Sequence, residues 1–217
     1  MKQILCFGDS NTWGLNAETG TRFPWEERWT GLLQEKLQGR DIRVIEEGLC
    51  GRTTVFEDPF RIGRRGTELL PTLLETHTPD AIVLMLGTND CKTYNHASAE
   101  RIGKGIEKLI QQIRKADPAI DILLVSPIEL GEDVWKPGFD LEFDQRSVKV
   151  SKQLKQTYLK IAWKYGCDFL AASDVAKPSK ADMEHMNEKG HKNLAKAIES
   201  FLVEKERNHS NNYVNVV

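Results

Sequence analysis

The sequence of 217 residues contains no run of apolar residues long enough to cross a lipid bilayer. It also lacks the pattern of a secretory signal peptide, because the first seven residues, Met1 to Phe7, carry one basic residue and only a short apolar run. That run leads directly into the strongest motif of the chain, so cleavage after it would remove the motif. We therefore expect a cytoplasmic protein with no role at a membrane.

The sequence also lacks a large excess of positive or negative charge. The 30 Lys and Arg residues are balanced by 32 Asp and Glu residues, which leaves a formal net charge of -2. This balance gives no electrostatic reason to expect nucleic acid as a partner. The length predicts one domain over residues 1–207, followed by an Asn-rich tail at 208–217 that we expect to fray.

The four cysteines are scattered, and no two of them form the Cys-x-x-Cys pair of many zinc and redox sites. This usage favours reduced thiols over a disulfide framework. His185 and His191 make a poor metal pair, because no third Cys or His lies near them in the sequence. We therefore expect neither a metal nor a cofactor.

Short apolar runs alternate with segments of helical periodicity. In residues 101–115, for example, Ile102, Ile106, Leu109 and Ile113 fall on one helical face. This alternation predicts an α/β fold, a doubly wound, flavodoxin-like parallel sheet of five strands with helices on both faces. The expected strands are 4–7, 43–45, 81–86, 122–126 and 168–170, and the expected helices are 28–37, 67–75, 101–115, 147–165 and 187–205.

A serine follows the first predicted strand in the segment Gly8-Asp9-Ser10. A serine between a buried strand and a helix holds its hydroxyl at the rim of the sheet, and its backbone N–H can point at a developing oxyanion. Ser10 is thus a candidate nucleophile. The alternative is a serine that caps an ordinary turn.

Two further candidates follow neighbouring strands. Asn89, after the third strand, can aim its side-chain N–H at the same oxyanion, because the first and third strands of such sheets are adjacent. Gly51, after the second strand, can bring a backbone N–H to the same place. Both are equally compatible with ordinary turns.

Asp182 and His185 lie three residues apart, directly before the last predicted helix. A catalytic triad needs an imidazole that accepts the serine proton and a carboxylate that holds the imidazole in one tautomer. At this spacing Asp182 can bond Nδ1 of His185 while Nε2 faces Ser10. A lone histidine in a loop is otherwise more often a surface residue.

Together these segments resemble the four sequence blocks of the SGNH (GDSL-type) hydrolases, in the right order and over almost the whole chain. Flanking residues narrow the resemblance to the mycobacterial-type arylesterase/acyltransferase branch. It implies that Ser10 is the nucleophile, His185 the base and then the acid, and Asp182 the residue that orients His185. The oxyanion hole that it implies consists of the backbone N–H groups of Ser10 and Gly51 and the side chain of Asn89.

The sequence departs from that family at two positions. Met183 stands where the family usually has glycine, so the loop of Asp182 and His185 is expected to run differently. Leu15 stands where the acyltransferase branch tends to have a second Trp after Gly14, which weakens the case for efficient acyl transfer in water.

We interpret the chain as a carboxylic ester hydrolase that cleaves short-chain acetyl or aryl esters through an acyl-serine, with acyl transfer as an additional activity. The alternatives are a thioesterase or lysophospholipase of the same family, or an inactive binding protein on the same fold. A homo-oligomer is implied by the branch. Residues 131–146 are expected to form a lid or a subunit contact. The residues expected to line the substrate pocket are Asp9, Trp13, Thr88, Lys92 and Trp135.

Overall fold

The computed structural model describes the backbone of residues 1–214 and the side chains of residues 1–205. Five parallel strands form one sheet in the order β2-β1-β3-β4-β5. This is the flavodoxin-like order of a doubly wound sheet, so the predicted fold class is confirmed. The strands are β1 (Lys2–Gly8), β2 (Ile42–Gly48), β3 (Ala81–Met85), β4 (Asp121–Ser126) and β5 (Asp168–Ala171).

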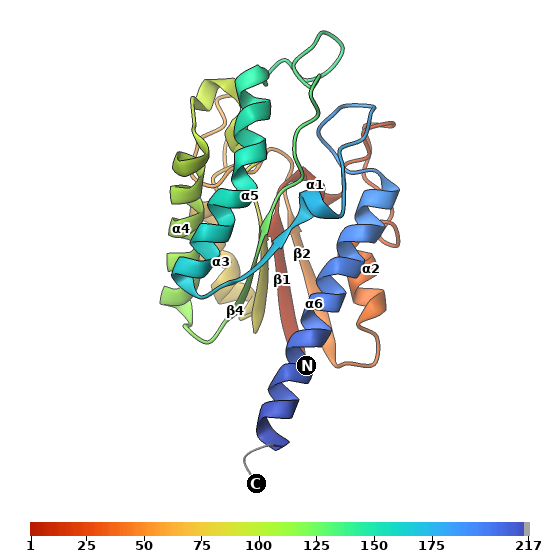
Figure 1. Cartoon of the computed structure of the whole chain (residues 1–217), viewed down its shortest axis with the longest axis vertical. Helices are drawn as coiled ribbons and strands as arrows, with labels where there is room; N and C mark the ends of the chain where they lie inside the picture. Colours follow the sequence, from red (N-terminus) through yellow and green to blue (C-terminus); the bar gives the residue numbers. More distant parts are fainter. Residues whose placement is uncertain (215–217) are drawn as a thin grey trace.

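Helices cover both faces of the sheet. Helices α3, α4 and α5 pack side by side on one face, and α2 and α6 cover the other (Figure 1). The short α1 lies at the carboxyl end of β1. The bounds of these helices are α1 (Ser10–Trp13), α2 (Trp29–Lys36), α3 (Gly66–His77), α4 (Ala99–Ala116), α5 (Gln145–Tyr165) and α6 (Glu188–Val214).

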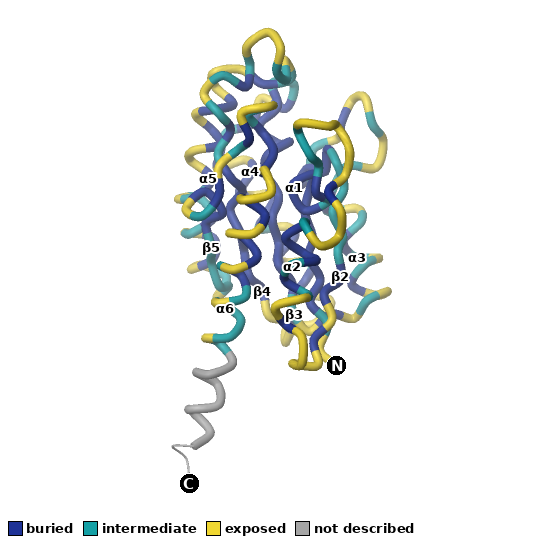
Figure 2. Tube along the Cα trace, turned by 90° about the vertical axis from the view of Figure 1, so that its right-hand side faces the viewer, coloured by how far each residue is buried: buried dark blue, intermediate teal, exposed yellow. Residues whose placement is uncertain are grey.

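The central parts of β1, β3 and β4 are apolar because helices bury both faces of the sheet there (Figure 2), whereas β2 carries Arg43, Glu46 and Glu47. Along β1, Leu5 and Phe7 belong to the core beneath α3, α4 and α5, whereas Ile4 and Cys6 belong to the core beneath α2 and α6. Successive side chains of a strand point to opposite faces, so one short run supplies both cores.

Local sequence determines where several helices begin and end. The carboxylate of Asp144 accepts a hydrogen bond from the backbone N–H of Ser147 at 2.7 Å and starts α5 as part of a capping box. Gly166 ends α5 with a left-handed φ of 61°. Helix α6 runs beyond its expected end at residue 205, and the expected fraying at 208–217 falls on residues whose side chains are not described.

No helix within residues 1–214 combines the length and the apolar character that a membrane span requires. All four cysteines are free thiols, and two of them, Cys6 and Cys91, are buried.

The strand order places the candidate residues at one point of the sheet. From β1 the chain turns to β2 on one side, and later to β3 on the other. At such a switch point the loops leave a crevice at the carboxyl ends of the strands. Ser10, Gly51 and Asn89 follow β1, β2 and β3 at this edge.

Candidate active site

Ser10 is the first residue of α1, a single helical turn that begins directly after β1. Asp9 caps this turn, because its carboxylate accepts a hydrogen bond from the backbone N–H of Asn11 at 2.9 Å. Glycine is required at position 8, since a Cβ there would lie 2.0 Å from Oγ1 of Thr12. The tight turn thus holds the hydroxyl of Ser10 at the carboxyl edge of the sheet.

His185 and Asp182 reach this hydroxyl from the other end of the chain. Nε2 of His185 lies 2.7 Å from Oγ of Ser10, and Nδ1 lies 2.5 Å from Oδ2 of Asp182. Oδ1 of Asp182 accepts hydrogen bonds from the backbone N–H groups of Glu184 and His185 at 2.9 and 3.0 Å. The arrangement has the form of nucleophile, base and orienting carboxylate.

The loop between Asp182 and His185 keeps a glycine-type backbone without a glycine. Met183 has a left-handed φ of 61°, a conformation that glycine adopts at little steric cost. Its carbonyl oxygen accepts a hydrogen bond from the backbone N–H of Gly131 at 2.8 Å. Met183 thus adopts the backbone that a glycine would adopt here, and Asp182 keeps its hydrogen bonds with His185.

The three donors expected at an oxyanion come from three different loops. Among the described residues, the backbone N–H groups of Ser10 and Gly51 donate to no other group. Nδ2 of the buried Asn89 donates one hydrogen to the carbonyl oxygen of Arg52 at 3.2 Å, and an amide of this kind has a second hydrogen to donate. Gly51 has a left-handed φ of 81°, and a Cβ there would lie 2.5 Å from the guanidinium of Arg61.

A buried carboxylate joins the loops of Gly51 and Asn89. Asp90 accepts hydrogen bonds from the backbone N–H of Thr54 at 3.0 and 3.1 Å and also from its hydroxyl. Burial raises the pKa of Asp90 to about 7, although the bonds from Thr54 act in the opposite direction. These bonds fix the loop after β2 against the loop after β3.

Negative groups surround the imidazole. Burial by itself lowers the pKa of His185, but the charges of Glu184, Asp182 and Asp9 outweigh burial and raise it to about 9. Burial raises the pKa of Asp182, yet its hydrogen bonds with His185 outweigh burial and keep it below the ordinary value. The pair is therefore ionised at neutral pH, with the imidazole held firmly by its carboxylate.

Residues 6–192 match the family model of the GDSL-like lipases and acylhydrolases. The chain belongs to this family. The predicted resemblance is thereby confirmed, and with it the predicted class, a serine ester hydrolase.

Relatives with more specific names cover different shares of the chain. A stretch of 91 residues, 41% of the chain, is 34% identical to an arylesterase of Vibrio mimicus, but it spans only 38% of that protein. The structure of the M. smegmatis aryl esterase is 34% identical, with a TM-score of 0.87 over 94% of this chain and 99% of that one. A carbohydrate acetylesterase family member from Sinorhizobium meliloti is 37% identical, with a TM-score of 0.87 over 93% and 97%.

The expected pocket residues of this GDSL-like hydrolase lie in different surroundings. Asp9 and Thr88, which directly precede Ser10 and Asn89 in the sequence, are both buried. The ammonium of the buried Lys92 pairs with Glu142, which joins residues 131–146 to the loop after β3.

The two expected pocket tryptophans are both partly buried. The guanidinium of Arg22 lies 4.8 Å from the ring centre of Trp13. The ring of Trp135 packs against the core beneath α3, α4 and α5, while its Nε1 donates to the carbonyl oxygen of Glu132 at 2.9 Å. Whether either ring contacts a substrate stays a prediction.

Sequence reasoning missed Glu184, a carboxylate directly beside the imidazole. Its side chain is only 8% exposed, and Oε1 lies 3.8 Å from Nε2 of His185. Burial raises the pKa of Glu184 to about 6, so it is ionised at neutral pH. A glutamate within a polar loop segment gives no sign of burial, so the sequence carries no signal that would have found it.

His191 has a structural role. It is buried, and its Nδ1 accepts a hydrogen bond from the backbone N–H of Trp29 at the start of α2, at 3.2 Å. Its ring packs edge-on against Phe23 with 5.2 Å between ring centres. Within the described part of the chain, no cluster of three or more His, Cys, Asp or Glu side chains is arranged to hold a metal ion.

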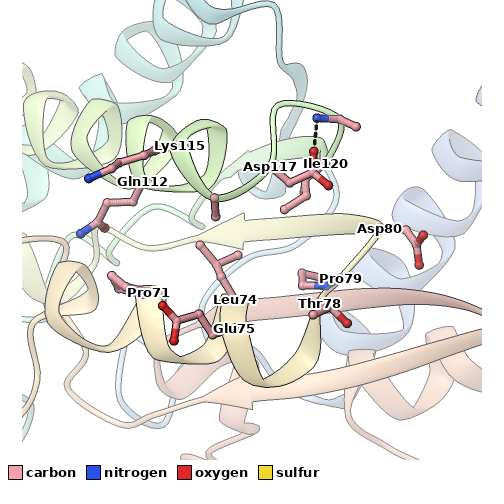
Figure 3. Close-up of a pocket in the computed structure, with 12 residues that line it drawn as sticks. Pro71, Leu74, Glu75, Thr78, Pro79, Asp80, Gln112, Lys115, Asp117 and Ile120 are labelled. Atoms are coloured by element: carbon pink, nitrogen blue, oxygen red, sulfur yellow. Dashed lines mark hydrogen bonds between the residues drawn. The ribbon is translucent and has the colours of Figure 1, made fainter.

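A groove of about 840 Å³ lies away from these residues, at the opposite end of the sheet (Figure 3). It runs between the end of α3, near Leu74 and Thr78, and the end of α4, near Lys115 and Ile120. None of its lining residues belongs to the loops of Ser10, Asn89 or His185. The groove therefore takes no part in the candidate active site.

Proposed function

We propose that this GDSL-like hydrolase cleaves short-chain carboxylic esters through an acyl intermediate on Ser10. The observation that carries the proposal is that one buried imidazole, that of His185, bonds both Oγ of Ser10 and the carboxylate of Asp182. Such a chain of bonds turns an ordinary hydroxyl into a nucleophile.

In the first half of the reaction, Oγ of Ser10 attacks the ester carbonyl carbon and Nε2 of His185 takes the hydroxyl proton. The carbonyl oxygen becomes an oxyanion, which accepts hydrogen bonds from the backbone N–H groups of Ser10 and Gly51 and from Nδ2 of Asn89. His185 then gives its proton to the leaving alcohol. Asp182 stabilises the imidazolium during both transfers.

In the second half, water attacks the acyl carbon while His185 again acts as base. The bond from carbon to Oγ breaks, Oγ regains its proton from Nε2, and the carboxylic acid leaves. No step requires a metal or an organic cofactor.

Acetyl and aryl esters are the proposed substrates, because the named relatives are an arylesterase, an aryl esterase and a carbohydrate acetylesterase family member. Acyl transfer to alcohols is proposed as a second outcome of the same intermediate. A thioesterase or lysophospholipase would instead favour thioesters or long acyl chains.

The test is a panel of p-nitrophenyl esters from acetate to palmitate, measured with the wild type and with Ser10→Ala. We expect turnover that falls with chain length, and a loss on the order of 10⁴-fold or more in the variant. An alanine variant that kept a tenth of wild-type turnover would refute Ser10 as the nucleophile. Preference for palmitate would favour the lysophospholipase alternative.

Cytoplasmic location and a homo-oligomeric state are also proposed. Four free thiols support the first, since disulfides are rare in a reducing cytosol. The exposed apolar side chains of Phe60, Ile62 and Leu141 support the second. Light scattering on the wild type and on Trp135→Ala tests whether residues 131–146 form a subunit contact; a monomeric wild type would contradict it.

A further inference from the structure

A carboxylate without a hydrogen-bond donor lies on the reactive side of the imidazole. Among the described residues, the side chain of Glu184 accepts no hydrogen bond, although it is only 8% exposed. Its oxygens are not completely enclosed by protein, so they keep a small contact with solvent. A buried acceptor in this condition is costly unless a donor reaches it from the solvent side.

The position of Glu184 is fixed by the triad itself. Its backbone N–H donates to Oδ1 of Asp182 at 2.9 Å. The nearby ammonium of Lys92 is already paired with Glu142. The distance of 3.8 Å from Oε1 to Nε2 of His185 is too long for a direct hydrogen bond, but one oxygen atom about 2.8 Å from each of them can bridge the two.

We propose that Glu184 selects the acceptor of the acyl group, by binding a second hydrogen donor next to the hydrogen that His185 removes. Water has two hydrogens: His185 takes one as the oxygen attacks the acyl carbon of acyl-Ser10, and Glu184 accepts the other, which stays on the carboxylic acid product. A monohydric alcohol has only one hydroxyl hydrogen, which His185 removes, so no hydrogen is left to donate to Glu184. A vicinal diol attacks with one hydroxyl and donates with the other.

The leaving group of the ester contacts the same two side chains in the first half of the reaction. Nε2 of His185 gives its proton to the departing oxygen, and a neighbouring hydroxyl of the leaving alcohol donates a hydrogen bond to Glu184. Mono-esters of vicinal diols and polyols are therefore the favoured substrates over esters of simple alcohols. This inference rests on the proposed acyl-serine mechanism and gives it a class of acceptor and leaving group.

The experiment measures how one acyl-enzyme divides among competing acceptors. With p-nitrophenyl acetate as donor, the yields of acetate, methyl acetate and glycol monoacetate are measured in water containing methanol or ethylene glycol. Because every product comes from the same intermediate, their ratio reports only on the acceptor step. The variants are Glu184→Leu and Glu184→Gln, with Glu188→Gln, at an exposed glutamate paired with Lys192, as the matched control.

We expect Glu184→Leu to raise the ratio of methyl acetate to acetate about tenfold, the contribution of one hydrogen bond to a charged acceptor. The preference for glycol over methanol should fall by a similar factor. Glu184→Gln keeps an acceptor oxygen, so both ratios should change by only about threefold. It also keeps the side-chain shape, which leaves a folded variant to measure if Glu184→Leu does not fold. Glu188→Gln should keep the wild-type ratios.

Unchanged ratios in the folded variants overturn the inference, whether or not their pH profiles move. If the wild type releases no more p-nitrophenol than Ser10→Ala, the proposed function itself fails and the inference with it. If p-nitrophenol release is normal but the product ratios of the Glu184 variants equal those of the wild type, only the role of Glu184 is refuted.

Discussion

The side chain of Asn11 accepts a hydrogen bond from the backbone N–H of Met186 at 2.9 Å. Asn11 follows Ser10, and Met186 follows His185, so this single bond joins the two segments whose side chains meet at 2.7 Å. Both residues are buried. The bond therefore holds the imidazole of His185 in line with the hydroxyl of Ser10.

Replacing Asn11 with alanine should lower kcat on p-nitrophenyl acetate by about 10- to 100-fold with little change in KM, because a small displacement of the base is enough to slow proton transfer. Steady-state kinetics and the melting temperature are measured together. Asn16→Ala, which removes an asparagine from an exposed turn, is the control. A loss of stability without a loss of kcat would leave Asn11 a purely structural role.

Asn89→Ala should lower kcat by roughly 10²–10³ and leave KM nearly unchanged, because the amide donor serves an oxyanion that exists only along the reaction path. Asn193→Ala, at an exposed backbone contact, should keep wild-type kinetics. If instead KM rose while kcat stayed constant, Asn89 would be a substrate contact and not part of an oxyanion hole.

The pH dependence of kcat/KM should follow the ionisation of His185. The imidazole must be neutral to accept the proton of Ser10, so the rate should rise with pH and level off above about pH 9. Glu184→Gln removes a negative charge beside the imidazolium, which lowers the pKa of His185 and moves the rising limb to lower pH by about one unit. Asp182 and Asp9 keep their charges in this variant.

The same profile is recorded for Glu188→Gln, whose carboxylate pairs with Lys192 on the surface, and it should superimpose on that of the wild type. A rising limb that stays in place in Glu184→Gln would show that the charge of Glu184 does not reach the base.

Activity should survive exhaustive dialysis against EDTA. The proposed reaction uses only a hydroxyl, an imidazole, a carboxylate and N–H donors, so a chelator has no target in it. Hydrolysis of p-nitrophenyl acetate before and after dialysis is the measurement. Loss of turnover that zinc or manganese restores would contradict a mechanism based on the serine alone.

His191 should make the protein less stable in mild acid. Burial is the main cause that lowers its pKa to about 4, so between pH 6.5 and 4 the unfolded chain binds a proton that the folded chain does not. The free energy of unfolding should therefore fall as the pH falls through this range, by about 3 kcal/mol in total from this residue.

Urea unfolding of the wild type and of His191→Asn at pH 7 and pH 5 isolates this contribution. The asparagine retains an acceptor for the backbone N–H of Trp29, and its unfolding free energy should depend less on pH. His96→Asn, at an exposed histidine, should keep the wild-type dependence. Equal pH dependence in wild type and His191→Asn would refute the assignment.

Much of the fold follows from patterns that neighbouring residues produce. The apolar run around Leu5 and Phe7 predicts a strand buried on both faces, because the side chains on both of its faces are apolar. The spacing of Ile102, Ile106 and Leu109 predicts a helix with one buried face, and these residues lie in the core of α4. The predicted ends of helices and strands differ from the observed ends by a few residues, because caps and tertiary contacts determine where the last turn of a helix stops.

Patterns in the sequence predict the order of strands and helices along the chain, the family, and the residue types needed for a serine hydrolase. The hydrogen bond between Ser10 and His185, 175 positions apart, depends on the tertiary structure. So does the contrast between Glu184, which is buried against the imidazole, and Glu188, four positions on, which pairs with a lysine on the surface. Burial and approach depend on how distant segments pack, and no local pattern records which of two similar glutamates the packing will enclose.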